Sequence, residues 1–292
     1  MKPAGRSYVL ESIPQPLLSF LFAVYPESRG ILRYRRVFGR LPKVIRPKTL
    51  NEKILHKMLF DRNPQMTIFA DKFLVRAFVR SRLGDERCLT RLYGVVTSPK
   101  EIRSLSLPAQ FVMKANHGSG WVKMVRDAKG LDDGELESLA ALWLGQNFYD
   151  RYQEWAYKNI KPLVLFEELL NPEGKIPEDY KFYCFKGEPR FLNIDRERFV
   201  KHSRNYYDLG LSLLPVRHFK YENFVEQVSP PQNFDRMLEV SRRLSAGADF
   251  LRVDLYNVAG RVVFGELTNY PDHAMQRLLP PEWDLKFGNH WK

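Results

Sequence analysis

The sequence predicts an α+β protein in which a mostly helical region precedes a smaller and then a larger α+β lobe. Three observations predict this class. Helix signals fill residues 49–84, short β-type runs begin at about residue 106, and a β-hairpin pattern lies near the end of the chain, at 250–267. The expected regions are a basic and mostly helical segment at 1–105, the smaller lobe at 106–165 and the larger lobe at 166–292.

The helices of the first region are marked by residues that favour helix ends. Thr49 with Glu52 three positions later forms a capping-box pattern, in which the two residues cap each other's backbone N–H groups. Asn63 followed by Pro64 is typical of an N-cap and a first helical residue, and Gly84 suits a C-terminal stop. We therefore expect consecutive helices between these residues.

The two lobes are predicted from a change of period. Apolar residues alternate or run in short blocks, separated by turns such as the glycine-bearing segment 116–120. Helical stretches are expected at 133–157 and at 233–245. The expected strands are 111–114, 121–125, 163–166, 180–185, 190–194, 250–256 and 262–267.

Composition narrows the class of protein. Of 292 residues, 44% are hydrophobic and 27% charged, which excludes disordered, collagenous and coiled-coil chains. The net charge is +12, but residues 1–50 hold ten basic and two acidic residues, so the rest of the chain carries only +4. A nucleic-acid binder usually spreads Lys and Arg over one face of its domain, so no nucleic-acid partner is expected. Two cysteines, Cys88 and Cys184, are too few for a disulfide framework and fit a reducing cytoplasm.

An apolar run followed by a basic cluster distinguishes the N-terminal segment. The run, 17–25, is too short to span a bilayer, and no small-residue cleavage site follows it, so neither a transmembrane helix nor a signal peptide is predicted. The two features together predict peripheral contact with an anionic membrane surface, and a solvated charged edge over a core-facing segment is the alternative. The basic cluster comprises Arg29, Arg33, Arg35, Arg36, Arg40 and Lys43.

The last hairpin carries two carboxylates that we expect to face each other. Alternation sends Arg252 and Asp254 to one face of their strand. If the hairpin is symmetric about Gly260, Asp254 lies opposite Glu266 and Arg252 lies opposite Thr268. Like charges directly opposite are destabilising, and a divalent cation such as Mg²⁺ would compensate them. The alternatives are that Arg252 alone neutralises the pair, or that the register slips by one residue.

Lys114 ends an apolar strand just before the loop 116–120. A short Gly-Ser loop offers backbone N–H groups to phosphate oxygens, and a nearby lysine supplies positive charge. An ordinary hairpin turn explains Gly118 and Gly120 equally well. His117, alone in the loop, is more typical of a solvated or hydrogen-bonding residue than of a catalytic base.

Acidic residues follow the strand at 163–166. Glu167 and Glu168 come directly after it, and Asp179 and Lys181 begin the next strand. Acids at strand ends beside a loop can accept hydrogen bonds from an adenine amino group and from ribose hydroxyls, and they are also common as solvated strand ends. Taken singly, each of these acids is open to both interpretations.

Six segments appear in an order that is more specific than any one of them: LNEKILHKMLFDRNP, ADKFLVRAFV, FVMKANHGSG, LVLFEELL, EDYKFYCFKGEPRFLNIDRERF and MLEVSRRLSAGADFLRVDLYNVAGRVVFGELTNYP. From about residue 49 to the C-terminus, this order resembles the TupA-like branch of the ATP-grasp superfamily, which is associated with teichuronopeptide and other bacterial surface-polysaccharide biosynthesis. Many ATP-grasp enzymes have an Asn two residues beyond the metal-binding Glu, whereas this chain has Thr268 there, followed by Asn269.

The resemblance implies an ATP-grasp fold, in which two α+β lobes clamp ATP, with two Mg²⁺ ions as cofactors and Mn²⁺ as the alternative metal. In this scheme Arg252 stabilises charge at the reacting centre, and Lys181 and Arg196 contact phosphate or acidic substrate. The implied metal ligands are Asp254, Glu266 and either Thr268 or Asn269. The implied nucleotide-binding residues are Lys72, Lys114, His117, Gly118, Ser119, Gly120, Glu167, Glu168, Leu170 and Asp179.

The resemblance further implies a carboxylate–amine ligase that acts in the cytoplasm. ATP would phosphorylate a carboxylate to an acyl phosphate, and an amine would displace the phosphate to leave an amide. A polysaccharide context predicts a uronic acid, an amino acid or a glycan-linked carboxylate as the substrate. The alternatives are a glycosyltransferase of the same pathway, which would need a nucleotide-sugar site, and a non-catalytic polyanion-binding protein.

Overall fold

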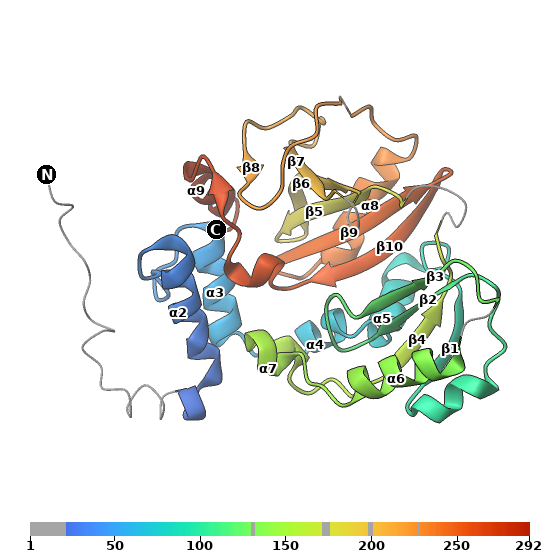
Figure 1. Ribbon diagram of the computed structural model, residues 1–292. Coiled ribbons are helices and arrows are strands. Elements are labelled where there is room, and N and C mark those ends of the chain that lie inside the picture. Colours follow the sequence, from blue (N-terminus) through green and yellow to red (C-terminus); the bar gives the residue numbers. More distant parts are fainter. Residues whose placement is uncertain (1–21, 130–131, 171–175, 198–200, 227) are drawn as a thin grey trace, which may run out of the picture.

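The computed structural model describes residues 22–129, 132–170, 176–197, 201–226 and 228–292. Two antiparallel sheets occupy two lobes, one above the other in Figure 1, and α2 and α3 lie to one side of them. The α+β class predicted from the sequence is confirmed. The helices are α2 (Arg29–Phe38), α3 (Leu50–Phe60), α4 (Gln65–Ala70), α5 (Leu74–Leu83), α6 (Asp133–Leu144), α7 (Tyr149–Tyr152), α8 (Phe234–Ser245) and α9 (Glu282–Gly288), with short 3₁₀ helices η1 (Pro26–Ser28), η2 (Pro99–Ser104), η3 (Trp155–Tyr157) and η4 (Pro271–Ala274).

The smaller sheet has its strands in the order β1-β4-β2-β3. One face packs against α6, where Leu136 and Trp143 join Phe166 in a buried apolar cluster. Because β1 pairs with β4, the domain boundaries predicted at 105/106 and 165/166 divide the strands of this sheet. The strands are β1 (Leu92–Val96), β2 (Phe111–Ala115), β3 (Val122–Val125) and β4 (Val164–Glu167).

The larger sheet has its strands in the order β10-β9-β5-β6-β7, so neighbours in space are often distant in sequence. A separate pair, β11 with β8, lies near its outer edge, where β7 meets β8. The strands are β5 (Asp179–Phe185), β6 (Glu188–Arg196), β7 (Ser203–Tyr207), β8 (Arg217–His218), β9 (Phe250–Val258), β10 (Arg261–Thr268) and β11 (Leu278–Leu279).

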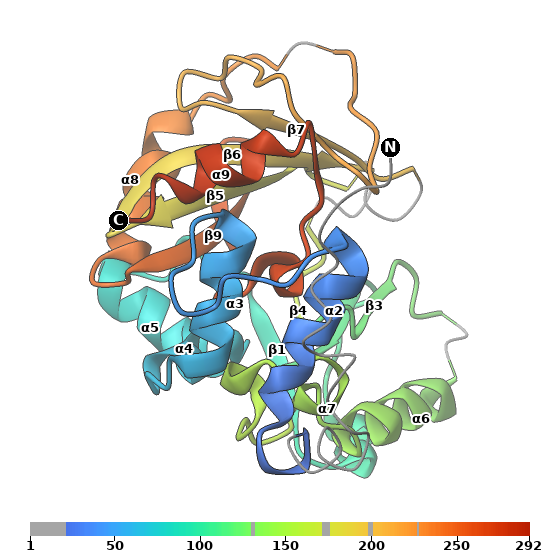
Figure 2. The ribbon, with the colours of Figure 1, turned by 90° about the vertical axis from the view of Figure 1, so that its left-hand side faces the viewer.

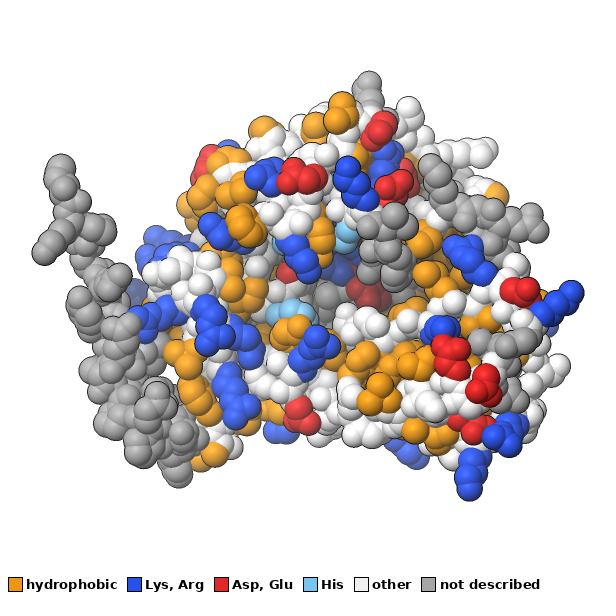
Figure 3. Space-filling model, in the orientation of Figure 1, with side chains coloured by type: hydrophobic (Ala, Val, Ile, Leu, Met, Phe, Trp, Pro, Cys, Tyr) orange, Lys and Arg blue, Asp and Glu red, His pale blue; other side chains and the backbone are white. Residues whose placement is uncertain are grey.

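The two faces of the larger sheet differ in what covers them. Phe182, Leu192 and Val253 point to one face and join an apolar cluster with residues of α5 and α8. At one end of the opposite face, Tyr183 and Phe250 pack with residues of α3 and α9. The rest of this second face is polar and lies toward the smaller lobe. Figure 3 shows a hollow between the lobes in which basic, acidic and histidine side chains gather.

Helix α2 belongs to the core of the protein. Tyr34 is fully buried among residues of α3, and Arg40 forms an ion pair of 2.6 Å with Glu52. Arg33 donates to the side chain of Gln153 at 2.6 Å, so α2 is tied to the segment after α7 as well as to α3, beside which it runs in Figure 2. Two members of the basic cluster are therefore bonded within the protein. Most of the apolar run before the cluster lies outside the described residues.

Most elements predicted from the sequence are confirmed. The capping box of Thr49 and Glu52 is present at α3, and Gly84 ends α5 in the left-handed region with φ of 81°. The single helix predicted at 133–157 is wrong, because α6 ends at Gly145 and only α7 and η3 follow it. Among the helices of the described ranges, none has the length and apolar content needed to cross a bilayer.

Candidate active site between the lobes

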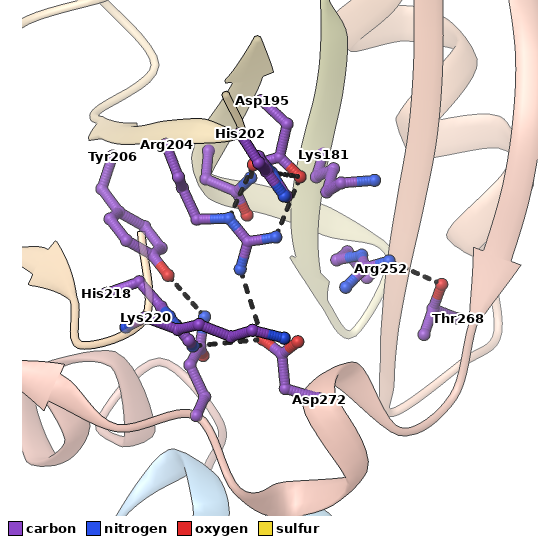
Figure 4. Close-up of polar contacts among 12 residues, drawn as sticks. Lys181, Asp195, His202, Arg204, Tyr206, His218, Lys220, Arg252, Thr268 and Asp272 are labelled. Carbon is purple, nitrogen blue, oxygen red and sulfur yellow. Dashed lines mark hydrogen bonds and ion pairs between the residues drawn. The ribbon is translucent and has the colours of Figure 1, made fainter. Parts of the chain in front are cut away.

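A band of polar side chains crosses the cleft-facing side of the larger sheet from β10 to β7. Apart from the two residues on β10, its members are buried, so their charges must be paired inside the protein. Figure 4 shows part of this arrangement. We call it the polar band, and it consists of Glu266 and Thr268 on β10, Arg252 and Asp254 on β9, Asp179 and Lys181 on β5, Asn193 and Asp195 on β6, and Arg204 on β7.

A β-bulge sets the register of the last hairpin. The turn residues 259–260 both have positive φ, and the strand pairs next to them are one position away from the predicted symmetry. Gly265 is the extra residue, and beyond it Glu266 lies opposite Asp254, so the predicted pair is confirmed. The bulge also lets Phe264 pack into the cluster under α8 while Glu266, two residues on, turns to the opposite face.

Arg252 neutralises the two carboxylates of the hairpin, as one of the sequence alternatives expects. Its Nε and Nη2 each donate to Asp254 at 2.7 Å, and Nη2 also reaches Glu266 Oε1 and Thr268 Oγ1 at 3.0 Å. Burial raises the pKa of Asp254 to about 6, against the opposing effect of the Arg252 guanidinium. Arg252 therefore contacts both carboxylates of the hairpin and the hydroxyl of Thr268.

Lys181 links the hairpin to the next strand. Its ammonium lies 2.6 Å from Asp254 Oδ2 and 2.5 Å from Asp179 Oδ2, and all three side chains are buried. Lys181, predicted to contact phosphate or acidic substrate, is thus paired with two carboxylates of its own chain. Asp179, predicted among the nucleotide-binding residues, is one of these two partners.

The oxygen donors of the hairpin fit a hard divalent cation. Asp254 and Glu266 face each other, and Thr268 Oγ1 lies 3.0 Å from Glu266 Oε1. The side-chain Nδ2 of Asn269 donates to the carbonyl of Met66 at 2.9 Å, and its Oδ1 is buried without a hydrogen-bond partner among the described residues. Mg²⁺ is commonly held by one or two carboxylates together with phosphate oxygens and water. Among the described residues, no group of three or more His, Cys, Asp or Glu side chains is placed to hold a metal ion.

A pocket lies between the lobes, beside the hairpin. Lys72 and Lys114 line it on one side and Glu266 on the other. Burial lowers the pKa of Lys72 to about 8. Apolar side chains complete the walls, among them Phe69, Val75, Leu89, Phe264 and Leu267. The pocket therefore combines two ammonium groups with apolar surface.

Glu167, at the end of β4, is the acidic residue of this pocket's smaller-lobe wall. It accepts hydrogen bonds from Arg76 at 3.0 Å and Thr90 at 2.9 Å, and Lys114 Nζ lies 2.5 Å from its second oxygen. Glu168 points elsewhere and pairs with the arginine at the start of β10 at 2.9 Å. Of the two adjacent acids, only Glu167 lines the pocket with Lys114.

His117 is a structural residue of the loop before β3. It is buried, and its two ring nitrogens lie 2.9 Å from the side-chain oxygen of Asn116 and from the carbonyl of Trp143. Burial lowers its pKa. With both nitrogens occupied by the protein, His117 offers no group to a nucleotide, whereas the sequence analysis placed it among the nucleotide-binding residues.

Gly118 brings the same loop against the pocket. Its carbonyl accepts a hydrogen bond from Lys72, and a Cβ at this position would lie 2.4 Å from the ring of Trp121. Only glycine fits there without a shift of the tryptophan. The next two residues, Ser119 and Gly120, are exposed, and Gly120 has φ of 79°.

Two further predicted residues lie apart from this arrangement. Arg196 is at the end of β6, pairs with Glu178 at 2.5 Å and lies over the ring of Phe224 at 4.0 Å, away from the polar band. Leu170 follows β4 and is half-buried, outside the lining of the pocket. The resemblance had placed both residues near the nucleotide or its substrate.

Sequence reasoning missed three of the nine residues of the polar band and part of the pocket. The missed band residues have a signal that could have found them, because polar and apolar residues alternate in 192–195 as they do in 251–254. The pocket residues have no such signal, since they come from helices and loops. The missed residues are Asn193, Asp195 and Arg204 in the band and Arg76, Thr90 and Tyr157 in the pocket.

Two lobes thus enclose a pocket lined by lysines, next to a hairpin with paired carboxylates. The TupA-like ATP-grasp family model matches residues 52–292, and the chain belongs to this family. The family assignment rests on that sequence model. No curated protein matches the chain significantly.

The chain is also similar to solved structures of ATP-grasp ligases, at scores too low to carry an argument. The ligase PsnB complexed with a minimal precursor has 15% identity and a TM-score of 0.41, over 71% of this chain and 53% of that chain. D-alanine–D-alanine ligase from Bacillus anthracis complexed with ATP has 16% identity and a TM-score of 0.42, over 77% and 63%. The macrocyclase MdnC from Microcystis aeruginosa, bound with the precursor peptide MdnA, has 12% identity and a TM-score of 0.41, over 89% and 66%. This chain thus spans about half the length of PsnB.

Proposed function

We propose that the protein is an ATP- and Mg²⁺-dependent ligase that joins a carboxylate to an amine through an acyl phosphate, in bacterial cell-surface polysaccharide or teichuronopeptide biosynthesis. The observation that carries the proposal is the placement of Lys72 and Lys114 across one pocket from Glu266, which the Arg252 guanidinium contacts at 3.0 Å. Phosphoryl transfer needs positioning and charge neutralisation rather than a protein nucleophile, and this site supplies both.

The nucleotide occupies the interlobe pocket in this proposal. Its phosphates lie against Lys72 and Lys114, which are the cations of the pocket's smaller-lobe side. The exposed amides of Ser119 and Gly120 cover the phosphates, as backbone N–H groups do in other anion-binding loops. The base lies toward the connection that follows Glu167, where backbone groups can meet the edge of adenine.

The hairpin holds the metal in this proposal. Asp254 and Glu266 supply carboxylate oxygens for the two expected Mg²⁺ ions, which neutralise charge on the transferred phosphoryl group when bound. The third ligand is either Thr268, whose hydroxyl lies 3.0 Å from Glu266, or Asn269, whose Oδ1 is buried without a hydrogen-bond partner among the described residues. Mn²⁺, which also prefers oxygen ligands, remains the alternative metal.

The reaction proceeds in two displacements. A carboxylate oxygen of the substrate bonds to the γ-phosphorus as the bond from phosphorus to the ADP oxygen breaks. The amine nitrogen then bonds to the acyl carbon, the bond from carbon to the phosphate oxygen breaks, and phosphate leaves with the electron pair. Arg252, fixed by two hydrogen bonds to Asp254, provides a positive charge preorganised for the first displacement.

We also propose that the enzyme acts in the cytoplasm with contact to an anionic membrane surface, where a lipid-linked glycan would be accessible. Arg29, Arg36 and Lys43 support this contact, because they are exposed on the N-terminal segment. Replacing these three residues by glutamine should abolish sedimentation with anionic liposomes and leave turnover of soluble substrates unchanged. Equal sedimentation of both proteins would contradict the membrane contact.

The ligase proposal is tested by phosphate release with ATP, Mg²⁺ and crossed panels of uronic acids and amino acids. We expect release that needs one carboxylate and one amine, and that disappears in Glu266→Ala, whereas Glu239→Ala on the exposed side of α8 serves as a matched control with full activity. Thermal stabilisation by a nucleotide sugar but not by ATP with Mg²⁺ would favour a glycosyltransferase. Salt-sensitive binding of polyanions without any turnover would favour the non-catalytic alternative.

A further inference from the structure

The outer end of the polar band holds a polar cluster that none of the roles above uses. At its centre Arg204 donates to both oxygens of Asp195, at 2.6 and 2.9 Å. Asn193 Nδ2 donates to the same carboxylate at 2.9 Å, and His202 Nε2 lies 3.2 Å from it. Asp195 is 1% exposed and fully engaged, so it fixes Arg204 in place and has no capacity left for a ligand.

Asp272, on the loop after β10, completes this cluster, and its carboxylate is partly exposed to solvent. Arg204 Nη1 lies 3.3 Å from its Oδ2, and the carboxylate is 29% exposed. Within the described part of the chain, its Oδ1 accepts no hydrogen bond. Figure 4 shows Asp272 facing Arg204 on the side of the cluster that lies toward Arg252 and Thr268. A group bound at Asp272 therefore lies beside the proposed site of phosphoryl transfer.

His218 offers the complementary group. It is 6% exposed, and its Nδ1 accepts a hydrogen bond from the backbone N–H of Lys220 at 3.1 Å. In the neutral ring the proton is then on Nε2, and burial lowers the pKa of His218 to about 4, so the ring is neutral at pH 7. Nε2 lies 3.8 Å from Asp272 Oδ2, too far for a hydrogen bond, and is buried without any partner among the described residues.

A buried donor without an acceptor and a carboxylate with an open oxygen therefore lie side by side. An ammonium group would satisfy Asp272 but leave the Nε2–H of His218 unpaired. A carboxylate would satisfy His218 but meet the negative charge of Asp272. A hydroxyl group satisfies both, because it accepts one hydrogen bond and donates another.

The backbone at this loop supports a preset site. Asp272, His273 and Ala274 have φ of 48°, 56° and 64°, a run of left-handed residues that is uncommon outside glycine. The loop is held there by the ring of His273, which stacks on Tyr152 with centroids 3.6 Å apart and lies 2.6 Å from Glu154. The Asp272 carboxylate is thus positioned before any substrate arrives.

We propose that Asp272 and His218 bind a ring hydroxyl of a sugar, so that a hydroxylated, sugar-bearing molecule is one of the two substrates. This inference rests on the proposed ligase function for its place in the reaction, but the binding site itself can be tested without turnover. It selects the uronic acids and glycans over the free amino acids among the substrates considered for this enzyme.

The binding test is saturation-transfer NMR on the full-length protein with Mg²⁺ and a non-hydrolysable ATP analogue. The probes are D-glucuronate, D-galacturonate and N-acetyl-D-glucosamine, with cyclohexanecarboxylate as the matched ring that has no hydroxyls. We expect at least one sugar probe to bind about tenfold or more tightly than cyclohexanecarboxylate, as the loss of a hydrogen bond to a charged group predicts. Equal affinity for all four probes, or no binding of any sugar, overturns the proposal.

Two pairs of variants separate recognition from folding. Asp272→Gly removes the carboxylate and Asp272→Asn keeps an acceptor, and both residue types tolerate the left-handed backbone at this position. His218→Gln keeps a donor that reaches the Nε2 position, whereas His218→Asn keeps only the acceptor for Lys220 N–H. We expect Asp272→Gly and His218→Asn to lose the preference for sugars and the other two to keep part of it. Unchanged preference in all four overturns the proposal, and His290→Gln is the control.

Turnover then distinguishes the two proposals. If the sugar probes bind as expected but no carboxylate and amine release phosphate from ATP, the ligase function fails while the sugar site stands. If phosphate release occurs with free amino acids only and is unaffected in His218→Asn, the ligase function stands and the sugar site is overturned. In the expected case, His218→Asn raises the KM for the sugar substrate about tenfold and leaves the KM for ATP unchanged.

Discussion

The positive charges of the interlobe pocket and those of the polar band are held in different ways. Lys72, in the pocket, donates to the carbonyl of Gly118 and has a pKa lowered by burial to about 8. Lys181, in the band, lies within 2.6 Å of two buried carboxylates. The comparison teaches that the two lysines differ in their partners. Among the described residues, Lys72 is paired with no carboxylate and can meet a ligand, whereas Lys181 neutralises buried carboxylates and so stabilises the larger sheet.

The largest expected effect is on stability, at Lys181. Lys181→Met removes a buried cation that lies within 2.6 Å of two buried carboxylates, Asp179 and Asp254, which should lower the free energy of unfolding by about 3 kcal/mol or more. Lys72→Met should change it by less than about 1 kcal/mol, because no carboxylate loses its partner. Urea unfolding measures both. As a control, the double variant Lys181→Met with Asp179→Asn should regain part of the lost stability. Equal losses of stability in Lys181→Met and Lys72→Met would contradict the proposed difference between the two lysines.

Arg252 tests whether a residue of the band also takes part in chemistry. Arg252→Met keeps the apolar stem and removes the guanidinium, so we expect turnover to fall about a hundredfold or more, as when one electrostatic stabiliser is lost. The affinity for ATP should stay within about tenfold, because Arg252 is outside the lining of the interlobe pocket, where we propose that ATP binds. Rapid-quench kinetics and calorimetric titration measure the two quantities. Full turnover in the variant would confine Arg252 to a structural role.

The next smaller effect is on the affinity for ATP, where the two lysines of the pocket, Lys72 and Lys114, should differ from each other. Lys72→Met should weaken binding of ATP with Mg²⁺ about tenfold, the size expected for one charge-assisted hydrogen bond. Lys114→Met should weaken it less, because Lys114 lies 2.5 Å from Glu167 and shares its charge with that carboxylate. Isothermal titration calorimetry measures both values. A larger effect at Lys114 would reverse the order inferred from the ion pair.

The smallest expected effect is a pH dependence of nucleotide binding. Because burial lowers the pKa of Lys72 from 10.5 to about 8, the free protein loses this charge as the pH rises through 8. ATP prefers the charged form, so its affinity should fall above pH 8, by at most about tenfold per pH unit. In the unfolded chain the lysine stays protonated to higher pH, so its unfavourable contribution to stability fades between pH 8 and 10.5. Lys72→Arg should bind ATP with an affinity that is flat over this range, and a parallel decline in both proteins would assign the effect to another group.

The sequence was informative where function depends on local pattern. The capping box at Thr49 and the pairing of Asp254 with Glu266 follow from spacing within one helix and one hairpin, and both are confirmed. The hairpin pair is right although the turn is shorter than predicted, because the bulge at Gly265 adds the missing position.

The parts that could not be predicted depend on contacts between distant segments. The register of β5 against β9 sets Lys181 beside Asp254, and these residues are separated by most of the larger lobe in sequence. Whether Lys181 meets a ligand or a buried carboxylate is decided by that register rather than by its own neighbours. Arg196 was expected near the substrate, but it directly follows Asp195 in the strand. Because side chains alternate along a strand, Arg196 points to the other face of the sheet and pairs there with Glu178.

Because Gly265 is a bulge residue, the last hairpin can change in length by one residue without a change of its strand pairing. Deleting this single codon would leave Phe264 opposite Leu255 and Glu266 opposite Asp254, so every pair in the ladder would survive. The deletion would nevertheless remove one peptide group from the wall of the interlobe pocket, which four consecutive residues of this strand line. A lineage could therefore reshape this pocket by an insertion or deletion without mutating either carboxylate of the hairpin.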